Sequence, residues 1–330
     1  MILARADQVS RRYGDVLALD RVDLTVRAGE MVGLLGPNGA GKSTLMNLIV
    51  GLRRPTSGRV ELFGGDPRDP ASRRKLGMTP QETGLPGTLR VGEVVDFAAA
   101  HYAEPVPRDE LLDRFGLTDQ VRRQTGGLSG GQRRRLAVAL AFVGRPRLVL
   151  LDEPTTGLDV EARRTLWDAI RAFHAEGGTV LLSSHYLEEV EALANRVVVI
   201  GHGRVLADDS VDAVRSVVGV RRVSFVADDL PALPGVVRSE LIDGRNHLLT
   251  TDADQLVRDL VTAGVAFTDL EVRPTSLEEA FLAITAEEPP SGDSRGARPG
   301  DGPVTVGSRP AGDDDEPTTT AAAGGRPATA

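Results

Sequence analysis

The feature that most constrains this chain is a nine-residue run, Gly36-Pro37-Asn38-Gly39-Ala40-Gly41-Lys42-Ser43-Thr44. It fits the spacing G-x-x-x-x-G-K-[ST], in which glycines let backbone N–H groups turn toward phosphate oxygens. An apolar segment, 31–35, precedes the run, and a segment of helical character, 44–50, follows it. This order predicts a strand, a phosphate-binding loop and a helix, with Lys42 at the β- and γ-phosphates and Ser43 binding Mg²⁺.

Composition limits what else the chain can be. With 330 residues, 41% of them apolar, it is long enough for one large α/β domain and a smaller one. It has no cysteine, which removes disulfides and thiolate chemistry. No signal peptide and no apolar run of about 18–20 residues is evident, so we expect a protein that is soluble by itself. A net charge of −8 argues against a general nucleic-acid binder, and no nucleic acid is expected as a partner.

Two adjacent carboxylates follow a buried strand at 148–151, namely Asp152 and Glu153. Open α/β sheets bind ligands beyond the carboxyl ends of their parallel strands. A carboxylate pair is costly there unless a cation or a reacting proton uses it. We therefore expect Asp152 to hold Mg²⁺, directly or through water, and Glu153 to accept a proton from an attacking water. His185, at the end of the next predicted strand, is placed to reach the γ-phosphate.

Three further features each have an ordinary structural interpretation. Tyr13, in a predicted loop at 11–15, either packs in the core or stacks on a base, and position alone favours packing. Gln81 follows a short strand and is expected to be a solvated loop residue. Ser129 is a good N-cap for a helix that starts with basic residues. Taken alone, the run Leu128-Ser129-Gly130-Gly131-Gln132 is best explained as a plain capped helix.

Taken in order, these features resemble the nucleotide-binding subunit of ATP-binding cassette (ABC) transporters. The resemblance rests on the phosphate loop, Gln81, Leu-Ser-Gly-Gly-Gln at 128–132, Asp152-Glu153, Asp159 and His185, and it covers residues 1 to about 215. The Leu-Ser-Gly-Gly-Gln run is specific to that family among phosphate-loop proteins. The single cassette, the run 182–190 and the C-terminal run 276–282 look like the exporter ATPases of the drug-resistance and polysaccharide branch.

The resemblance implies a role for each matching residue. Tyr13 stacks on adenine, Gln81 contacts Mg²⁺ and the attacking water, His185 grips the γ-phosphate and Asp159 lines a dimer seam. The signature run then completes the site of a second subunit, through Ser129, Gly130, Gly131 and Gln132. Two chains close head to tail on two ATP molecules and drive a separate multi-span permease at the cytoplasmic face of the membrane. One mild departure from the family is the run Leu-Arg-Val-Gly-Glu at 89–93, where the family commonly has Leu-Thr-Val-x-Glu. It lies near the expected membrane-docking surface, so it bears on the choice of partner and not on the chemistry.

The expected architecture is α/β with three parts. Residues 1–218 form a phosphate-loop NTPase core, a mixed sheet with flanking helices, and a helical subdomain occupies about 85–145. Residues 219–286 form a small α+β domain, with a turn at Asp243-Gly244-Arg245-Asn246, a helix that Asp252 can cap and a capping box at 276–279 that starts a last helix. Residues 287–330 are rich in Pro, Gly, Ala, Thr and Asp and lack aromatics, so we expect a disordered tail.

Two other functions are weaker fits to the sequence. A soluble ABC-type ATPase of translation or DNA repair would need no membrane partner. Such relatives usually carry two cassettes in one chain or a long coiled-coil insertion, and neither feature is evident here. A small-molecule kinase would leave 128–132 and His185 unexplained. The cargo of a transporter does not touch this subunit, so the sequence does not identify it.

Overall fold

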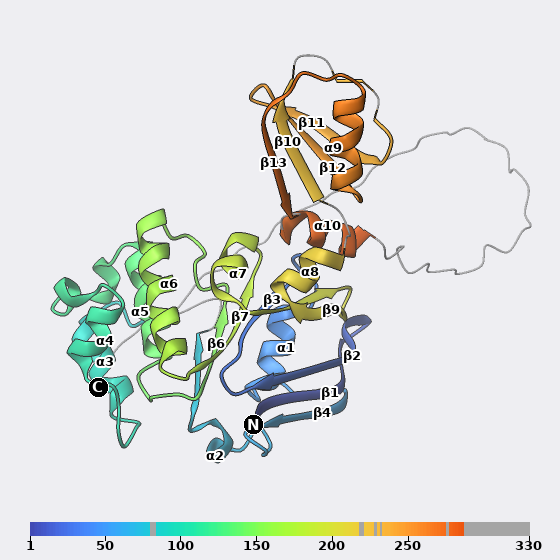
Figure 1. Cartoon of the computed structure of the whole chain (residues 1–330). Helices are drawn as coiled ribbons and strands as arrows, with labels where there is room; N and C mark the ends of the chain where they lie inside the picture. The colour runs from blue at the N-terminus through green and yellow to red at the C-terminus, as the bar shows by residue number, and fades with distance from the viewer. Residues whose placement is uncertain (80–83, 218–220, 228–229, 232, 275–276, 287–330) are drawn as a thin grey trace, which may run out of the picture. The chain divides into compact units, whose positions relative to one another are not determined.

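The computed structural model describes residues 1–79, 84–217, 221–227, 230–231, 233–274 and 277–286. The largest sheet has six strands (Figure 1). In spatial order these are β5 (Leu76–Thr79), β6 (Leu148–Asp152), β7 (Thr179–Ser184), β3 (Met31–Leu35), β8 (Arg196–Gly201) and β9 (Arg204–Ser210). The first five strands are parallel and β9 is antiparallel to β8. The predicted mixed sheet is thus confirmed.

The central strands are buried on both faces, which is why their sequences are continuous apolar runs. In β6, Leu148 and Leu150 point into one core, and Val149 and Leu151 into the other. The first core is closed by α1 (Lys42–Ile49) and by an antiparallel sheet of β2 (Val16–Arg27), β1 (Ile2–Tyr13) and β4 (Ser57–Leu62).

Helices close the second core. They include α3 (Val91–Ala99), α4 (Arg108–Arg114), α5 (Gly130–Leu140), α6 (Val160–Ala175), α7 (Leu187–Leu193) and α8 (Val211–Val217). Short elements complete this part of the chain: α2 (Pro70–Arg73) and 3₁₀ turns at Thr118–Gln120 and Thr125–Gly127. Helices α3, α4 and α5 lie within the predicted helical stretch 85–145.

One local prediction was wrong, and one helix was missed. The expected loop at 11–15 is mostly strand, because β1 continues to Tyr13 and only Gly14 and Asp15 form the turn to β2. Irregular register between Ala6 and Val9 and again beyond Val9 breaks the two-residue alternation that would have marked the strand. Helix α8 was not predicted at all.

The C-terminal segment forms a small sheet with its own core. Its antiparallel order is β11 (Val236–Ile242), β12 (Arg245–Thr250), β10 (Arg221–Val226) and β13 (Thr268–Pro274), and α9 (Ala253–Thr262) packs on it. The predicted turn at Asp243 and Gly244 has φ angles of 51° and 77°, as a two-residue hairpin requires. Asp252 caps α9 through the N–H of Gln255, as predicted. The proposed domain boundaries at 218 and 286 stay a prediction.

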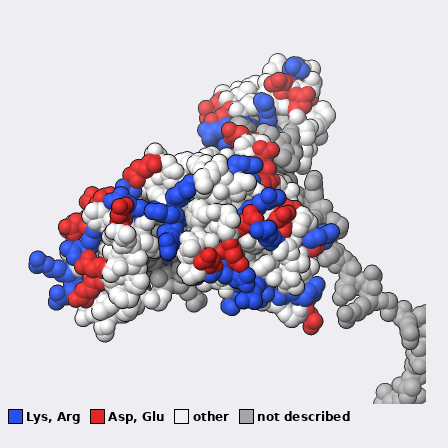
Figure 2. Space-filling view, turned by 90° about the horizontal axis from the view of Figure 1, so that it is seen from below, with Lys and Arg blue, Asp and Glu red and all other residues white. Residues whose placement is uncertain are grey.

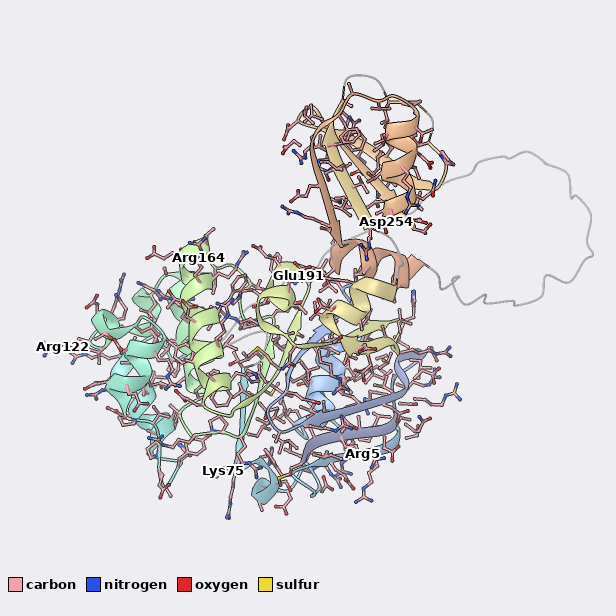
Figure 3. The ribbon with its side chains drawn as sticks, viewed as in Figure 1. Arg5, Lys75, Arg122, Arg164, Glu191 and Asp254 are labelled. Atoms are coloured by element: carbon pink, nitrogen blue, oxygen red, sulfur yellow. The ribbon has the colours of Figure 1, made fainter. Side chains whose placement is uncertain are left out.

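The last helix, α10 (Leu277–Ala286), joins the second core of the large sheet. Leu277 is buried there together with Val214 of α8. Glu191 of α7, labelled in Figure 3, accepts a hydrogen bond from the Leu277 N–H at 3.0 Å and pairs with Arg215 at 2.9 Å. One residue of the predicted capping box, Ser276, and the predicted tail lie outside the described residues. No helix in the described part of the chain could cross a bilayer.

A glycine in β5 gives a test of the packing between this strand and the segment after α5. A Cβ placed on Gly77 would lie far inside the van der Waals radius of the Ala141 carbonyl oxygen. We expect Gly77→Ala to lower the free energy of unfolding by about 1–3 kcal/mol, measured by urea denaturation. Gly84→Ala is the matched control, because a Cβ there meets nothing within 4 Å. Equal midpoints for the two variants would contradict this account.

Candidate nucleotide-binding site

The phosphate loop joins β3 to α1, as the sequence predicts, and two of its glycines have no substitute. A Cβ on Gly36 would collide with the carbonyl oxygen of Ile200. Gly41 has φ 108°, and a Cβ there would lie 2.7 Å from the Ala18 carbonyl oxygen. The loop is therefore shaped by close backbone approach, and it leads into the N-terminus of α1.

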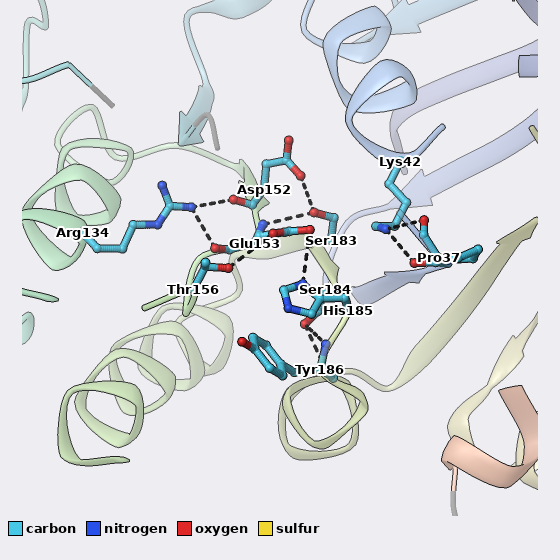
Figure 4. Close-up of polar contacts among 11 residues, drawn as sticks. Pro37, Lys42, Arg134, Asp152, Glu153, Thr156, Ser183, Ser184, His185 and Tyr186 are labelled. Atoms are coloured by element: carbon cyan, nitrogen blue, oxygen red, sulfur yellow. Dashed lines mark hydrogen bonds and ion pairs between the residues drawn. The ribbon is translucent and has the colours of Figure 1, made fainter. Parts of the chain in front are cut away.

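The Lys42 side chain is buried within the loop. Its ammonium donates to the carbonyl oxygens of Gly36 at 2.6 Å and Pro37 at 3.1 Å (Figure 4). Burial lowers the pKa of Lys42, while the carboxylates of Glu153 and Asp152 oppose that shift. A buried ammonium beside a helix N-terminus creates a strong preference for an anion.

Asp152 ends β6 and is only 3% exposed. Its carboxylate accepts a hydrogen bond from the Ser183 hydroxyl of the neighbouring strand β7. The same hydroxyl accepts the Glu153 N–H at 3.1 Å. Ser183, which the sequence analysis did not single out, thus fixes both carboxylate residues at the strand end.

Glu153 has an unusual backbone, with φ 48° in the left-handed region that residues other than glycine rarely adopt. Its side chain lies 3.3 Å from His185 Nδ1 through Oε1 and accepts a hydrogen bond from Thr156 Oγ1 at 3.3 Å (Figure 4). The structure therefore brings the predicted base together with the predicted phosphate-sensing histidine. Their direct contact was not predicted.

Arg134 of α5 reaches the end of β6 and was missed by the sequence analysis. Its guanidinium donates to the carbonyl oxygens of Asp152 at 2.6 Å, Glu153 at 2.9 Å and Pro154 at 3.2 Å. Burial lowers the pKa of Arg134, and the nearby carboxylates, Asp152 foremost, oppose that shift. The Arg134 side chain therefore ties α5 to the backbone that carries the carboxylates of Asp152 and Glu153.

The signature run begins α5 as predicted, with Ser129 as its N-cap. Ser129 Oγ accepts the Gln132 N–H at 3.1 Å, and Gln132 Oε1 accepts the Ser129 N–H at 3.0 Å, which is a complete capping box. Gly130 and Gly131 form the first turn of this helix. The plain capped helix that the run alone indicated is thus present.

The predicted site also includes Tyr13, Asp159 and Gln81. Tyr13, at the end of the β1–β2 hairpin, is 41% exposed, and the Arg11 guanidinium lies 4.4 Å from its ring centroid. Asp159 caps α6 by accepting the Ala162 N–H at 2.8 Å. Gln81 lies outside the described residues.

The residues present fit a nucleoside triphosphate and its metal. The loop offers backbone donors and a buried ammonium to phosphates, while Asp152 and the Ser43 hydroxyl are ligand types that Mg²⁺ accepts. No cluster of three or more metal-binding side chains exists among the described residues. Mg²⁺ at nucleotide sites usually takes one or two protein ligands plus phosphate oxygens and water, so the donor set suits it.

The fold and the site define a phosphate-loop nucleotide-binding cassette. Residues 19–156 match the profile of the ABC transporter family. The chain is 37% identical to a daunorubicin resistance ATP-binding protein of Streptomyces coeruleorubidus, over 85% of this chain and 94% of that protein. It is 36% identical to a Nod factor export ATP-binding protein of Cupriavidus metallidurans, over 85% and 96%. The chain belongs to the ABC transporter family of ATP-binding subunits, and its relatives confirm the resemblance to the exporter branch.

Solved structures agree with this assignment. An ATP-binding subunit of an ABC transporter superposes with a TM-score of 0.61 at 31% identity, covering 66% of this chain and 93% of that one. A dimeric ABC cassette in a post-hydrolysis state, bound to ADP and phosphate, superposes with a TM-score of 0.58 at 26% identity, covering 63% and 98%. The predicted fold class is confirmed.

Arg134 gives a test of the link between α5 and the end of β6. Arg134→Met keeps the apolar stem but removes the guanidinium donor from three carbonyl oxygens, of which that of Glu153 also accepts the Thr156 N–H at 3.3 Å. We expect the free energy of unfolding to fall by about 1–3 kcal/mol and ATP turnover to fall with it. Urea denaturation and phosphate release measure the two effects.

The matched control is Arg133→Met, one residue earlier on the exposed side of α5. Its stability is expected to stay within about 0.5 kcal/mol of wild type, as for most surface substitutions. If the two variants lost stability equally, the hydrogen bonds of Arg134 would not be what secures the strand end.

Proposed function

We propose that this chain converts ATP and water to ADP and phosphate, and that the reaction powers a membrane exporter. The observation that carries the proposal is the arrangement around Lys42, Asp152, Glu153 and His185. It brings a phosphate-binding ammonium, a metal-binding carboxylate, a base and an imidazole to the carboxyl ends of β3, β6 and β7. Relatives named for daunorubicin resistance and Nod factor export support efflux as the purpose of the reaction.

In the proposed reaction Glu153 accepts the proton of the attacking water. Its contact with His185 supports a role for the imidazole beside the reacting phosphoryl group, where it would donate a hydrogen bond to a γ-phosphate oxygen. Lys42 balances negative charge on the phosphates. Ser43, Asp152 and Gln81 would hold Mg²⁺, which when bound neutralises charge on the phosphate oxygens. Asn38, Gly39, Ala40 and Thr44 complete the loop around the phosphates, and Tyr13 offers an exposed ring to adenine.

The proposed working form is a head-to-tail homodimer. In this chain the N-terminus of α5 is capped by Ser129, and its first-turn glycines leave the backbone open to an anion. An ATP bound by one subunit would be covered by Ser129, Gly130, Gly131 and Gln132 of the other, with Asp159 near the seam. Hydrolysis would remove the γ-phosphate contacts that hold the two subunits together. The dimeric cassette among the solved structures supports this arrangement.

A cavity of about 920 Å³ is the proposed docking groove for a helix of the permease. Val50 and Leu52 line it at the end of α1, Met78 of β5 adds to its apolar floor, and Tyr102 follows α3. Its rim, on the side of α2, is taken to be the three basic lining residues Arg73, Arg74 and Lys75, which outnumber the one acidic lining residue, Glu104. An amphipathic helix with acidic residues on one edge has the chemistry to fit this groove.

The side of the molecule that carries the groove rim is charged. Lys75, labelled in Figure 3, points away from the ribbon beside α2. Figure 2 shows the molecule from below, the side on which α2 lies, with groups of Lys and Arg side chains separated by groups of Asp and Glu. Binding through this rim would place the chain at the cytoplasmic face of the membrane. The alternative of a soluble ATPase in translation or DNA repair is not favoured by the relatives.

The role of Glu153 is tested by Glu153→Gln, which keeps the shape of the side chain and removes its basicity. We expect the variant to bind ATP and to form a stable dimer, while hydrolysis falls about 10²–10⁴-fold. Phosphate release measures the rate, and size-exclusion chromatography with ATP measures the dimer. Wild-type turnover by the variant, or full turnover by a strict monomer, would contradict the proposed mechanism.

The docking groove is tested by Leu52→Asp, which places a charge on its apolar floor; Leu52 is 56% exposed. We expect about a tenfold or greater loss in capture of the co-expressed permease, because a desolvated carboxylate opposes an apolar helix face. Val237→Asp in β11 is the control, being similarly exposed at 65%. Equal capture by both variants would place the permease contact elsewhere.

A further inference from the structure

One buried acidic residue has no part in the mechanism above. Glu189 lies in the first turn of α7, four residues after His185, and is fully buried. Its Oε1 accepts a hydrogen bond from the indole N–H of Trp167 in α6, at a long 3.4 Å. A carboxylate is rarely tolerated in such a place unless a cation pairs with it or a proton neutralises it.

The second carboxyl oxygen of Glu189 needs a hydrogen-bond partner. Glu189 Oε2 is buried and has no hydrogen-bond partner, and the same is true of the buried hydroxyl Thr155 Oγ1. Buried polar groups without partners are rare and call for an explanation. The Thr155 and Ser184 hydroxyls are near enough to act on the carboxyl of Glu189. A hydrogen bond between Oε2 and Thr155 would satisfy both atoms at once.

The charges around Glu189 favour a neutral acid. Burial raises the pKa of Glu189, against smaller opposing effects of the neighbouring hydroxyls, Trp167 and Arg163. Arg163 of α6 is turned to the exposed Glu188, at 3.4 Å. Arg134 of α5 is also attracted by Glu189, but its guanidinium donates to the carbonyls at the end of β6. A protonated Oε2 is a donor, and the Thr155 hydroxyl can accept from it.

The position of this carboxyl connects the two catalytic loops. Thr155 lies two residues after Glu153, and Ser184 immediately precedes His185. The 3.3 Å contact between Glu153 and His185 joins the same two loops on the nucleotide side. The carboxyl of Glu189 therefore lies where a small movement of either loop would make or break a hydrogen bond.

We propose that Glu189 is a positioning residue, which as a neutral acid hydrogen-bonds Thr155 and so holds the Glu153 loop in register with His185. The inference rests on the proposed ATPase function and adds a residue that does not touch the nucleotide. Binding of a triphosphate draws the two loops together and closes the bond between Glu189 and Thr155. Release of phosphate lets it open again.

The test compares four variants with wild type in ATP turnover with the permease present. Glu189→Ala and Thr155→Val each remove one side of the hydrogen bond, and we expect kcat to fall about 10–100-fold with the KM for ATP little changed. Glu189→Gln keeps a neutral donor and acceptor of the same shape, so its kcat stays near that of wild type. The double variant Thr155→Val/Glu189→Ala is no slower than the slower single variant.

The matched control is Glu188→Ala, the adjacent and exposed glutamate, for which no change in kcat is expected. ATP affinity and the temperature of unfolding show that each variant folds, and Glu189→Gln and Thr155→Val are nearly isosteric. Wild-type kcat in Glu189→Ala would overturn the inference. So would a Glu189→Gln variant as slow as Glu189→Ala, because a charge and not a neutral hydrogen bond would then be needed.

A second measurement does not depend on hydrolysis. Trp167 is the one tryptophan of the chain, and its indole donates to Glu189, so its fluorescence reports on this cluster directly. We expect ATP to shift the wild-type emission, and the shift to vanish in Glu189→Ala and Thr155→Val. A shift that persisted in both variants would overturn the inference. A wild-type chain that hydrolysed no ATP would instead contradict the proposed function, and the emission data would still decide the role of Glu189.

Discussion

The structure around the nucleotide site depends on one buried cation. Lys42 is enclosed by its own loop and donates to the Gly36 and Pro37 carbonyl oxygens, which carry only partial negative charge. Such a group is stable in the interior only with its hydrogen bonds made and an anion at hand. The glycines admit the close backbone contact that encloses this cation, the parallel sheet presents its loop, and the carboxylates at the end of β6 favour its charged form. The rest of the site is arranged around this electrostatic requirement.

Hydrogen bonds from side chains to backbone carry this arrangement into the helical part of the fold. Arg134 donates to three successive carbonyl oxygens at the end of β6, so α5 is tied directly to this strand end. Ser183 holds the same strand end from β7. Glu153 keeps its strained backbone because Arg134 and Ser183 both hold it. Strained conformations persist only where the surrounding structure supports them in this way. The predicted base is therefore positioned from two elements that are distant in sequence.

Much of the fold was predictable because it depends on local patterns. The apolar runs of β3, β6 and β7, the N-cap Ser129 and the turn at Asp243 and Gly244 all follow from residues within a few positions. Arg134 and Glu189 were not predictable in that way. Three consecutive arginines suggest a solvated face, and two consecutive glutamates suggest the same, yet Arg134 is half-buried and Glu189 is fully buried by elements that are remote in sequence. For Glu189 a signal existed, since it shares the inward face of α7 with Val190 and Leu193.

The packing of α10 has a consequence for how such chains can be divided or recombined. Leu277 is buried beside Val214, and the start of α10 is bound by Glu191, from the helix that follows His185. A chain cut after α8 would leave this apolar patch bare to water, although every residue predicted to contact the nucleotide would be retained. Exchange of C-terminal segments between relatives would therefore have to carry α8 and α10 as a matched pair. In evolutionary terms, α10 therefore forms one unit with the ATP-binding part of the chain.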